Sequence, residues 1–124
     1  MAAASNPEAM KNRTKHFALL AIRLCRRLPP SQEQRIIVRQ LLRSATSVAA
    51  NYRAACRARS SADFISKLGL VLEEADESLF WLELLVDAGI ARPEHIALPM
   101  KEANELVAIF VASLRTAKGL KSAI

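Results

Sequence analysis

The chain contains few cysteines, glycines and aromatic residues, and each shortage excludes a class of protein. Its two cysteines, Cys25 and Cys56, are too few for a disulfide scaffold and lack the CxxC or Cys/His spacing of a zinc site. Only 5% of the 124 residues are aromatic and three are glycine, although 52% are hydrophobic, so Ala, Leu, Ile and Val must fill the core. That mixture favours packed helices, and the length fits one domain.

Long hydrophobic runs are absent as well. No apolar run approaches the roughly 18 residues needed to cross a bilayer, and residues 1–7 lack the charged start and apolar stretch of a secretory signal. We therefore expect a cytoplasmic protein that does not contact a membrane. Cys25 and Cys56 lie towards the apolar sides of the first two expected helices, so we predict that they are buried near each other and remain reduced.

Motifs of catalysis and cofactor binding are also missing. There is no GxxxxGK[ST], and the three glycines are isolated, which argues against a loop that holds nucleotide phosphates. Glu73, Glu74 and Glu77 lie close along one expected helix, but ferritin-like metal sites need Glu-x-x-His, and arginine stands three residues before both His16 and His95. Neither histidine belongs to a recognisable Ser or Cys motif. We predict no catalytic residue, no metal site, no cofactor and no small-molecule substrate.

Hydrophobic periodicity predicts four amphipathic helices. Their expected ranges are 10–28, 32–57, 61–88 and about 93–118. Pro29-Pro30 ends the first helix, because proline cannot continue it. Ser31 and Ser60 are candidate N-caps, and Gly89 is a natural C-terminal stop. Pro99 predicts a kink or a restart in the fourth helix, since proline removes a backbone hydrogen bond.

Four such helices joined by short loops predict an all-α fold, an antiparallel up-down four-helix bundle. We place the bundle at residues 10–118. Residues 1–9 are expected to form a disordered N-terminal tail and residues 119–124 a C-terminal tail.

Positive charge is concentrated in the first half of the chain, where residues 1–59 carry 12 Lys/Arg against two acids, whereas residues 60–124 carry 6 against 10. Five arginines of the second helix fall within about 80° of arc and form what we call the arginine stripe. They are Arg35, Arg39, Arg43, Arg53 and Arg57. Arginine favours planar recognition of phosphate or carboxylate. Two interpretations stay open: pairing with acids of the same protein, and contact with nucleic acid. No aromatic residues interleave with the stripe, which argues against base stacking with single strands.

A second apolar surface lies on the expected third helix, away from its core-facing residues. Its members are Leu70, Phe80, Trp81, Leu84 and Ala88. A bundle needs only one apolar face per helix, and so large a patch in water is unusual for a monomer. We therefore predict a homo-oligomer in which a neighbouring subunit covers Trp81.

Residues 40–60, QLLRSATSVAANYRAACRARS, resemble the second helix of the bacterial four-helix bundle family named for proteins encoded in 23S ribosomal RNA intervening sequences. The similarity spans about residues 13–118 and implies a bundle that assembles into a homopentameric ring, in a family without established catalytic activity. A related branch, the accessory variability proteins of diversity-generating retroelements, binds nucleic acid and a reverse transcriptase. Many members have an acidic residue and a glycine where this chain has Ala54 and Ala55.

Together, these patterns predict a non-enzymatic, self-assembling helical protein that serves as a scaffold for RNA or DNA. The alternative is a protein–protein interaction module that binds no nucleic acid. Salt-sensitive retention of nucleic acid distinguishes the two, because neutralising phosphates releases counterions.

Overall fold

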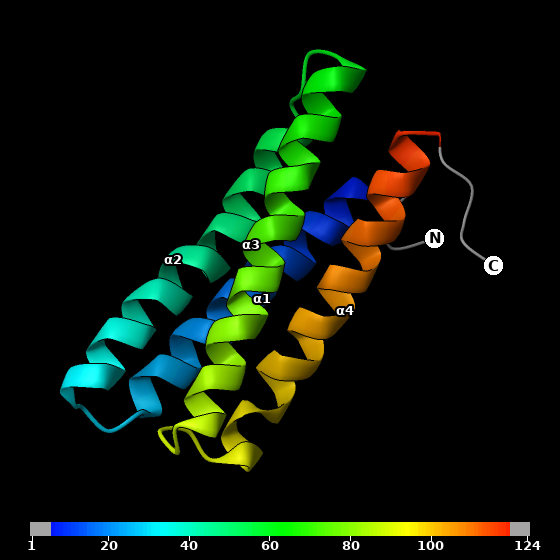
Figure 1. Cartoon of the computed structure of the whole chain (residues 1–124). Coiled ribbons are helices and arrows are strands. Elements are labelled where there is room, and N and C mark those ends of the chain that lie inside the picture. The colour runs from blue at the N-terminus through cyan, green and yellow to red at the C-terminus, as the bar shows by residue number, and fades with distance from the viewer. Residues whose placement is uncertain (1–5, 120–124) are drawn as a thin grey trace.

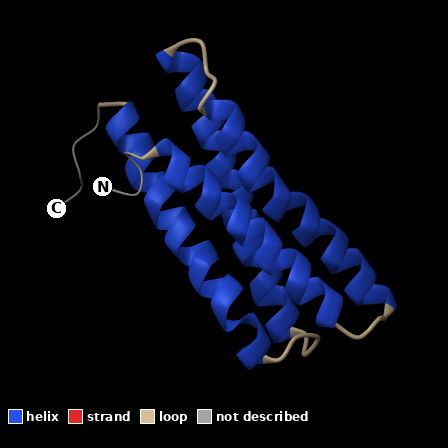
Figure 2. Cartoon of the chain, turned by 180° about the vertical axis from the view of Figure 1, so that it is seen from behind, coloured by secondary structure: helices blue, strands red, loops and turns tan. Residues whose placement is uncertain are grey.

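The computed structural model describes residues 6–119, which form four α-helices (Figure 1). These are α1 (Pro7–Arg27), α2 (Gln32–Ala55), α3 (Ser61–Asp87) and α4 (Pro93–Ala117). Figure 2 shows that loops alone connect them, and the described part of the chain contains no strand. The predicted all-α class with four helices is confirmed.

Side-chain caps explain where the first three helices begin. The side-chain oxygens of Asn6, Ser31 and Ser60 each accept a hydrogen bond from the backbone N–H three residues later, at 3.1, 3.0 and 3.1 Å. Each bond satisfies a donor that has no partner within the helix. Helix α1 starts at Pro7, before the expected Met10, because the Asn6 cap is followed by a proline whose fixed φ suits the first helical position. The tails were predicted at residues 1–9 and 119–124, but residues 7–9 form the first turn of α1. Residues 1–5 and 120–124 lie outside the described residues.

Helix α4 continues without a break through Pro99, so the predicted restart is absent. Pro99 has no N–H to donate to the carbonyl of His95, but its ring is buried with Ile96 and Ala103. Burial of this apolar face offsets the lost hydrogen bond.

Consecutive helices run in alternating directions and pack side by side, and α4 also packs against α1 (Figure 1). The inner faces meet in one core, to which every helix contributes a fully buried large side chain. Examples are Phe17, Leu41, Leu82 and Phe110. The ring centroids of Tyr52 and Phe110 lie 5.7 Å apart, so an aromatic contact joins α2 to α4 across the bundle. Removal of these side chains from water is the main force that holds the helices together.

A buried polar contact fixes how α2 lies along α3. The hydroxyl oxygens of Ser44 and Ser78 lie 2.8 Å apart, and the Ser44 hydroxyl donates to the carbonyl of Leu41 at 3.2 Å. Both hydroxyl groups are thereby satisfied, as buried polar groups must be. A shift of α2 along α3 would separate them.

An ion-pair cluster links α1 to α4. The Arg13 guanidinium donates to both oxygens of Glu102 at 2.9 Å and to Glu105 at 2.5 Å. These hydrogen bonds, that of Glu102 above all, raise the pKa of Arg13. The two-pronged contact uses the fork geometry that lysine lacks.

Replacing Arg13 with alanine is expected to lower the free energy of unfolding by about 1–2 kcal/mol, between the values for exposed and buried pairs. The side chain of Glu102 is only 15% exposed and would lose its main partner. Urea unfolding measures the effect. Arg13→Lys should recover only part of the loss, and an unchanged midpoint in Arg13→Ala would show that the cluster contributes nothing to stability.

Candidate nucleic-acid interface

All five residues of the arginine stripe are exposed, but they lie beside different neighbouring helices and differ in whether they form ion pairs. Arg43 turns towards α3, whereas Arg53 and Arg57 line a groove beside α1. Arg43 and Arg53 differ by 10 residues, or about 80° on a helical wheel, which places them on opposite edges of the exposed face of α2. Arg35 and Arg39 form no ion pair with any other residue between positions 6 and 119.

Arg43 is neutralised within its own chain. Its guanidinium lies 3.3 Å from Glu74 and also donates to Glu77, which accepts a further hydrogen bond from the indole Nε1 of Trp81 at 2.9 Å. The bond from Arg43, followed by that from Trp81, holds the pKa of the Glu77 carboxyl below its usual value. Of the two interpretations of the arginine stripe, pairing with acids of the same protein therefore applies to Arg43. With two carboxylates beside it, Arg43 is a poor ligand for phosphate.

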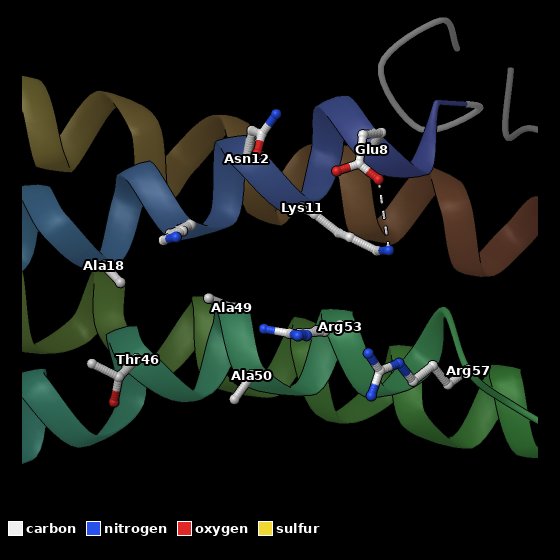
Figure 3. A pocket seen from close by; sticks show the side chains of 10 residues that line it. Glu8, Lys11, Asn12, Ala18, Thr46, Ala49, Ala50, Arg53 and Arg57 are labelled. Carbon is white, nitrogen blue, oxygen red and sulfur yellow. Dashed lines mark ion pairs between the residues drawn. The ribbon is translucent and has the colours of Figure 1, made fainter.

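A groove of about 660 Å³ lies between α1 and α2 (Figure 3). Four cationic side chains line it, and we call this set the basic groove: Lys11, Lys15, Arg53 and Arg57. The one carboxylate among the lining residues belongs to Glu8, 3.8 Å from the Lys11 ammonium. The groove therefore carries a clear excess of positive charge.

Helix geometry explains why these cations meet. Lys11 and Lys15 are four residues apart in α1, so they lie on one edge of that helix. Arg53 is in the last turn of α2, and Arg57 lies in the turn that follows the C-cap Cys56. Because α1 and α2 run in opposite directions, the two pairs come to lie beside the same stretch of groove (Figure 3). The groove is also lined by small side chains, Ala18, Thr46, Ala49 and Ala50. These leave room for a ligand between the charges.

The arginine pattern identified Arg53 and Arg57 but not Lys11 and Lys15. The lysines belong to another helix and gain significance only when α1 and α2 pair. The i, i+4 spacing of cations in both helices is the signal that could have found them.

In the single chain, fewer residues of the apolar surface predicted on α3 face solvent than the sequence suggested. Leu70 and Phe80 are 46% and 51% exposed. Trp81 and Leu84 are partly buried and already pack against the core, while Ala88 is the exposed C-cap of the helix. The Phe80 and Trp81 rings meet edge to face at 4.8 Å. The solvent-facing part of this apolar surface is centred on Phe80.

The two cysteines are free but not near each other, contrary to the prediction. Cys25 is buried in the last turn of α1, whereas Cys56 is half-buried at the C-terminal end of α2. Antiparallel pairing places these two helix ends at opposite ends of the bundle. Burial raises the pKa of the Cys25 thiol to about 11. A shared apolar face fixes the side of a helix but not the position along it.

Among the described residues, no helix is both long enough and apolar enough to span a membrane. Across residues 6–119, no three His, Cys, Asp or Glu side chains gather as ligands for a metal ion would.

Residues 9–112 match the family model of the 23S rRNA-intervening sequence protein. The chain belongs to this family. A similar solved structure is that of a protein from Bacteroides thetaiotaomicron VPI-5482, described as a protein with unknown function from the S23 ribosomal protein family and determined at 1.70 Å resolution. The two chains are 32% identical with a TM-score of 0.80, and the similarity covers 88% of this chain and 97% of that chain. No curated protein matches. The family resemblance carried by residues 40–60 is confirmed.

Proposed function

We propose that this member of the 23S rRNA-intervening sequence protein family is a cytoplasmic, non-enzymatic scaffold that binds RNA or DNA through the basic groove. The groove carries the proposal because four cations, from α1 and from the C-terminal end of α2 with the turn after it, converge there with a single carboxylate. Phosphates supply the negative charge that such a surface attracts, and both arginine and lysine bind them.

The distribution of acidic residues supports the same surface. Helix α3 carries seven Asp/Glu and one lysine, whereas α1 and α2 each carry one glutamate. A polyanion is therefore attracted to the α1–α2 side of the bundle and repelled from α3. This asymmetry directs nucleic acid to the basic groove.

We propose further that the up-down bundle assembles into a homo-oligomeric ring, a pentamer by resemblance to the family. The exposed Phe80 and Leu70 support self-association, because apolar side chains of this size favour burial between subunits. Several basic grooves on one oligomer would bind a long polyanion more tightly than one groove.

Charge reversal in the basic groove tests nucleic-acid binding. The variant Arg53→Glu/Arg57→Glu should bind a labelled RNA or DNA hairpin at least about tenfold more weakly than the wild type, because two phosphate contacts become repulsive. Four contacts also predict a roughly hundredfold loss of wild-type affinity between about 50 and 200 mM salt. Fluorescence anisotropy over a salt series measures both quantities.

Two variants serve as controls. Arg92→Glu/Lys101→Glu reverses the same number of charges on α4, where both side chains are exposed, and should retain wild-type affinity. Arg43→Ala should also bind normally, because Arg43 is paired with Glu74 and Glu77. Wild-type protein that binds neither hairpin at low salt would overturn the proposal and leave the protein-interaction module as the remaining function.

A further inference from the structure

A second group of cations lies further along the same two helices. Arg26 of α1 is 11 residues after Lys15, and Arg39 of α2 is 14 residues before Arg53. Because the helices run in opposite directions, both steps lead from the basic groove towards the same end of the bundle (Figure 1). Arg35 lies one turn beyond Arg39. We call Arg26, Arg35 and Arg39 the distal cluster; all are exposed, and none is ion-paired in the described part of the chain.

The surface between the two groups carries little free charge. Between Lys15 and Arg26, the one charged residue of α1 is the exposed Arg23, three residues before Arg26, and residues 44–52 of α2 contain no Lys, Arg, Asp or Glu. Arg43, which lies between the groups on α2, is held by Glu74 and Glu77. Positive charge is therefore concentrated at two places along the α1–α2 face, with small and apolar side chains between them.

The separation of the two groups matches a dimension of nucleic-acid duplexes. At 1.5 Å per residue, steps of 11 and 14 residues correspond to about 16 and 21 Å. The major groove of B-DNA is about 12 Å wide, and with the phosphate groups that border it, the phosphates of the two strands lie roughly 18 Å apart. We infer that the basic groove and the distal cluster bind phosphates of opposite strands of a double helix. The α1–α2 face thus bridges one groove of the duplex.

This inference rests on the proposed function and specifies its ligand. A rigid duplex holds its two rows of phosphates at a fixed distance, whereas a single strand must be ordered before it can satisfy both groups of cations. Single-strand binders compensate by stacking bases on aromatic side chains, and the residues that line the basic groove include none. Contacts to phosphate alone also predict binding without sequence preference.

Anisotropy measurements on full-length protein test the bridge with three probes: an RNA duplex, a DNA duplex of the same sequence and an unstructured single strand. Wild-type protein should bind a duplex at least about tenfold more tightly than the single strand. Reversal in the distal cluster, Arg35→Glu/Arg39→Glu, should weaken duplex binding at least about tenfold and reduce the salt slope by about 1.8, as should Arg53→Glu/Arg57→Glu. Arg92→Glu/Lys101→Glu should change neither value.

The outcomes separate the inference from the function on which it rests. If Arg53→Glu/Arg57→Glu weakens binding but Arg35→Glu/Arg39→Glu does not, or if the single strand binds as tightly as the duplexes, nucleic-acid binding stands and the bridge is refuted. If none of the probes binds at low salt, the proposed function fails. If one duplex binds more tightly than the other, that result shows whether RNA or DNA supplies the phosphates. Tighter binding of either duplex than of the single strand supports the bridge.

Discussion

Replacing Phe80 with glutamate is expected to convert the protein from an oligomer to a monomer. Phe80 is 51% exposed in the single chain, and an aromatic side chain buries about 150–250 Å² when it is fully covered. Covering its exposed half contributes about 2–3 kcal/mol per subunit at roughly 25 cal/mol per Å². A glutamate at the same place loses this contribution and adds the cost of burying a charge. Light scattering should show a change from several chains per particle to one.

A control on another face separates lost assembly from a general effect of surface charge. Leu98 on α4 is 59% exposed, and Leu98→Glu introduces the same carboxylate there. This variant should keep the mass of the wild type. A wild-type monomer at micromolar concentration would refute self-association, and a Phe80→Glu variant that remains oligomeric would place the interface elsewhere. The same masses test the proposed number of subunits, five.

The helices could be predicted because their signals are local. Helices α2 and α3 were expected at 32–57 and 61–88 and are found at Gln32–Ala55 and Ser61–Asp87, since the Ser31 and Ser60 caps are encoded within one turn of each start. The restart predicted at Pro99 is absent for a reason that is not local. The effect of this proline on α4 depends on burial against other helices, which hydrophobic periodicity does not measure.

The candidate site was only partly predictable, because its chemistry depends on which helices become neighbours. A helical wheel places Arg43 and Arg53 on the same face of α2. It does not show that Glu74 and Glu77 of α3 lie beside Arg43. Nor does it show that Lys11 of α1 lies beside Arg53. One arginine is thereby neutralised, while the other joins an unneutralised groove. The pairing of helices, not the stripe itself, decides which arginines remain available to phosphate.

Removing the ring of Phe110 is expected to have the largest effect on stability. Phe110 is buried in α4, and its ring packs against Tyr52 of α2 at a centroid distance of 5.7 Å. Phe110→Ala leaves a cavity in the centre of the bundle, and such changes cost about 3–5 kcal/mol. For a domain of this size, that loss lowers the melting temperature by about 10–20 °C. Calorimetry and urea unfolding of the purified variant measure it.

The neighbouring residue supplies the control. Val111 follows Phe110 on the same turn but is exposed, so Val111→Ala should cost less than about 1 kcal/mol. A loss below about 1 kcal/mol in Phe110→Ala as well would mean that the end of α4 collapses onto α2 and fills the cavity. A loss of the expected size shows that the buried Phe110 ring stabilises the bundle in which it packs against Tyr52. Because Arg53 follows Tyr52 in α2, the same packing holds the part of α2 that lines the basic groove.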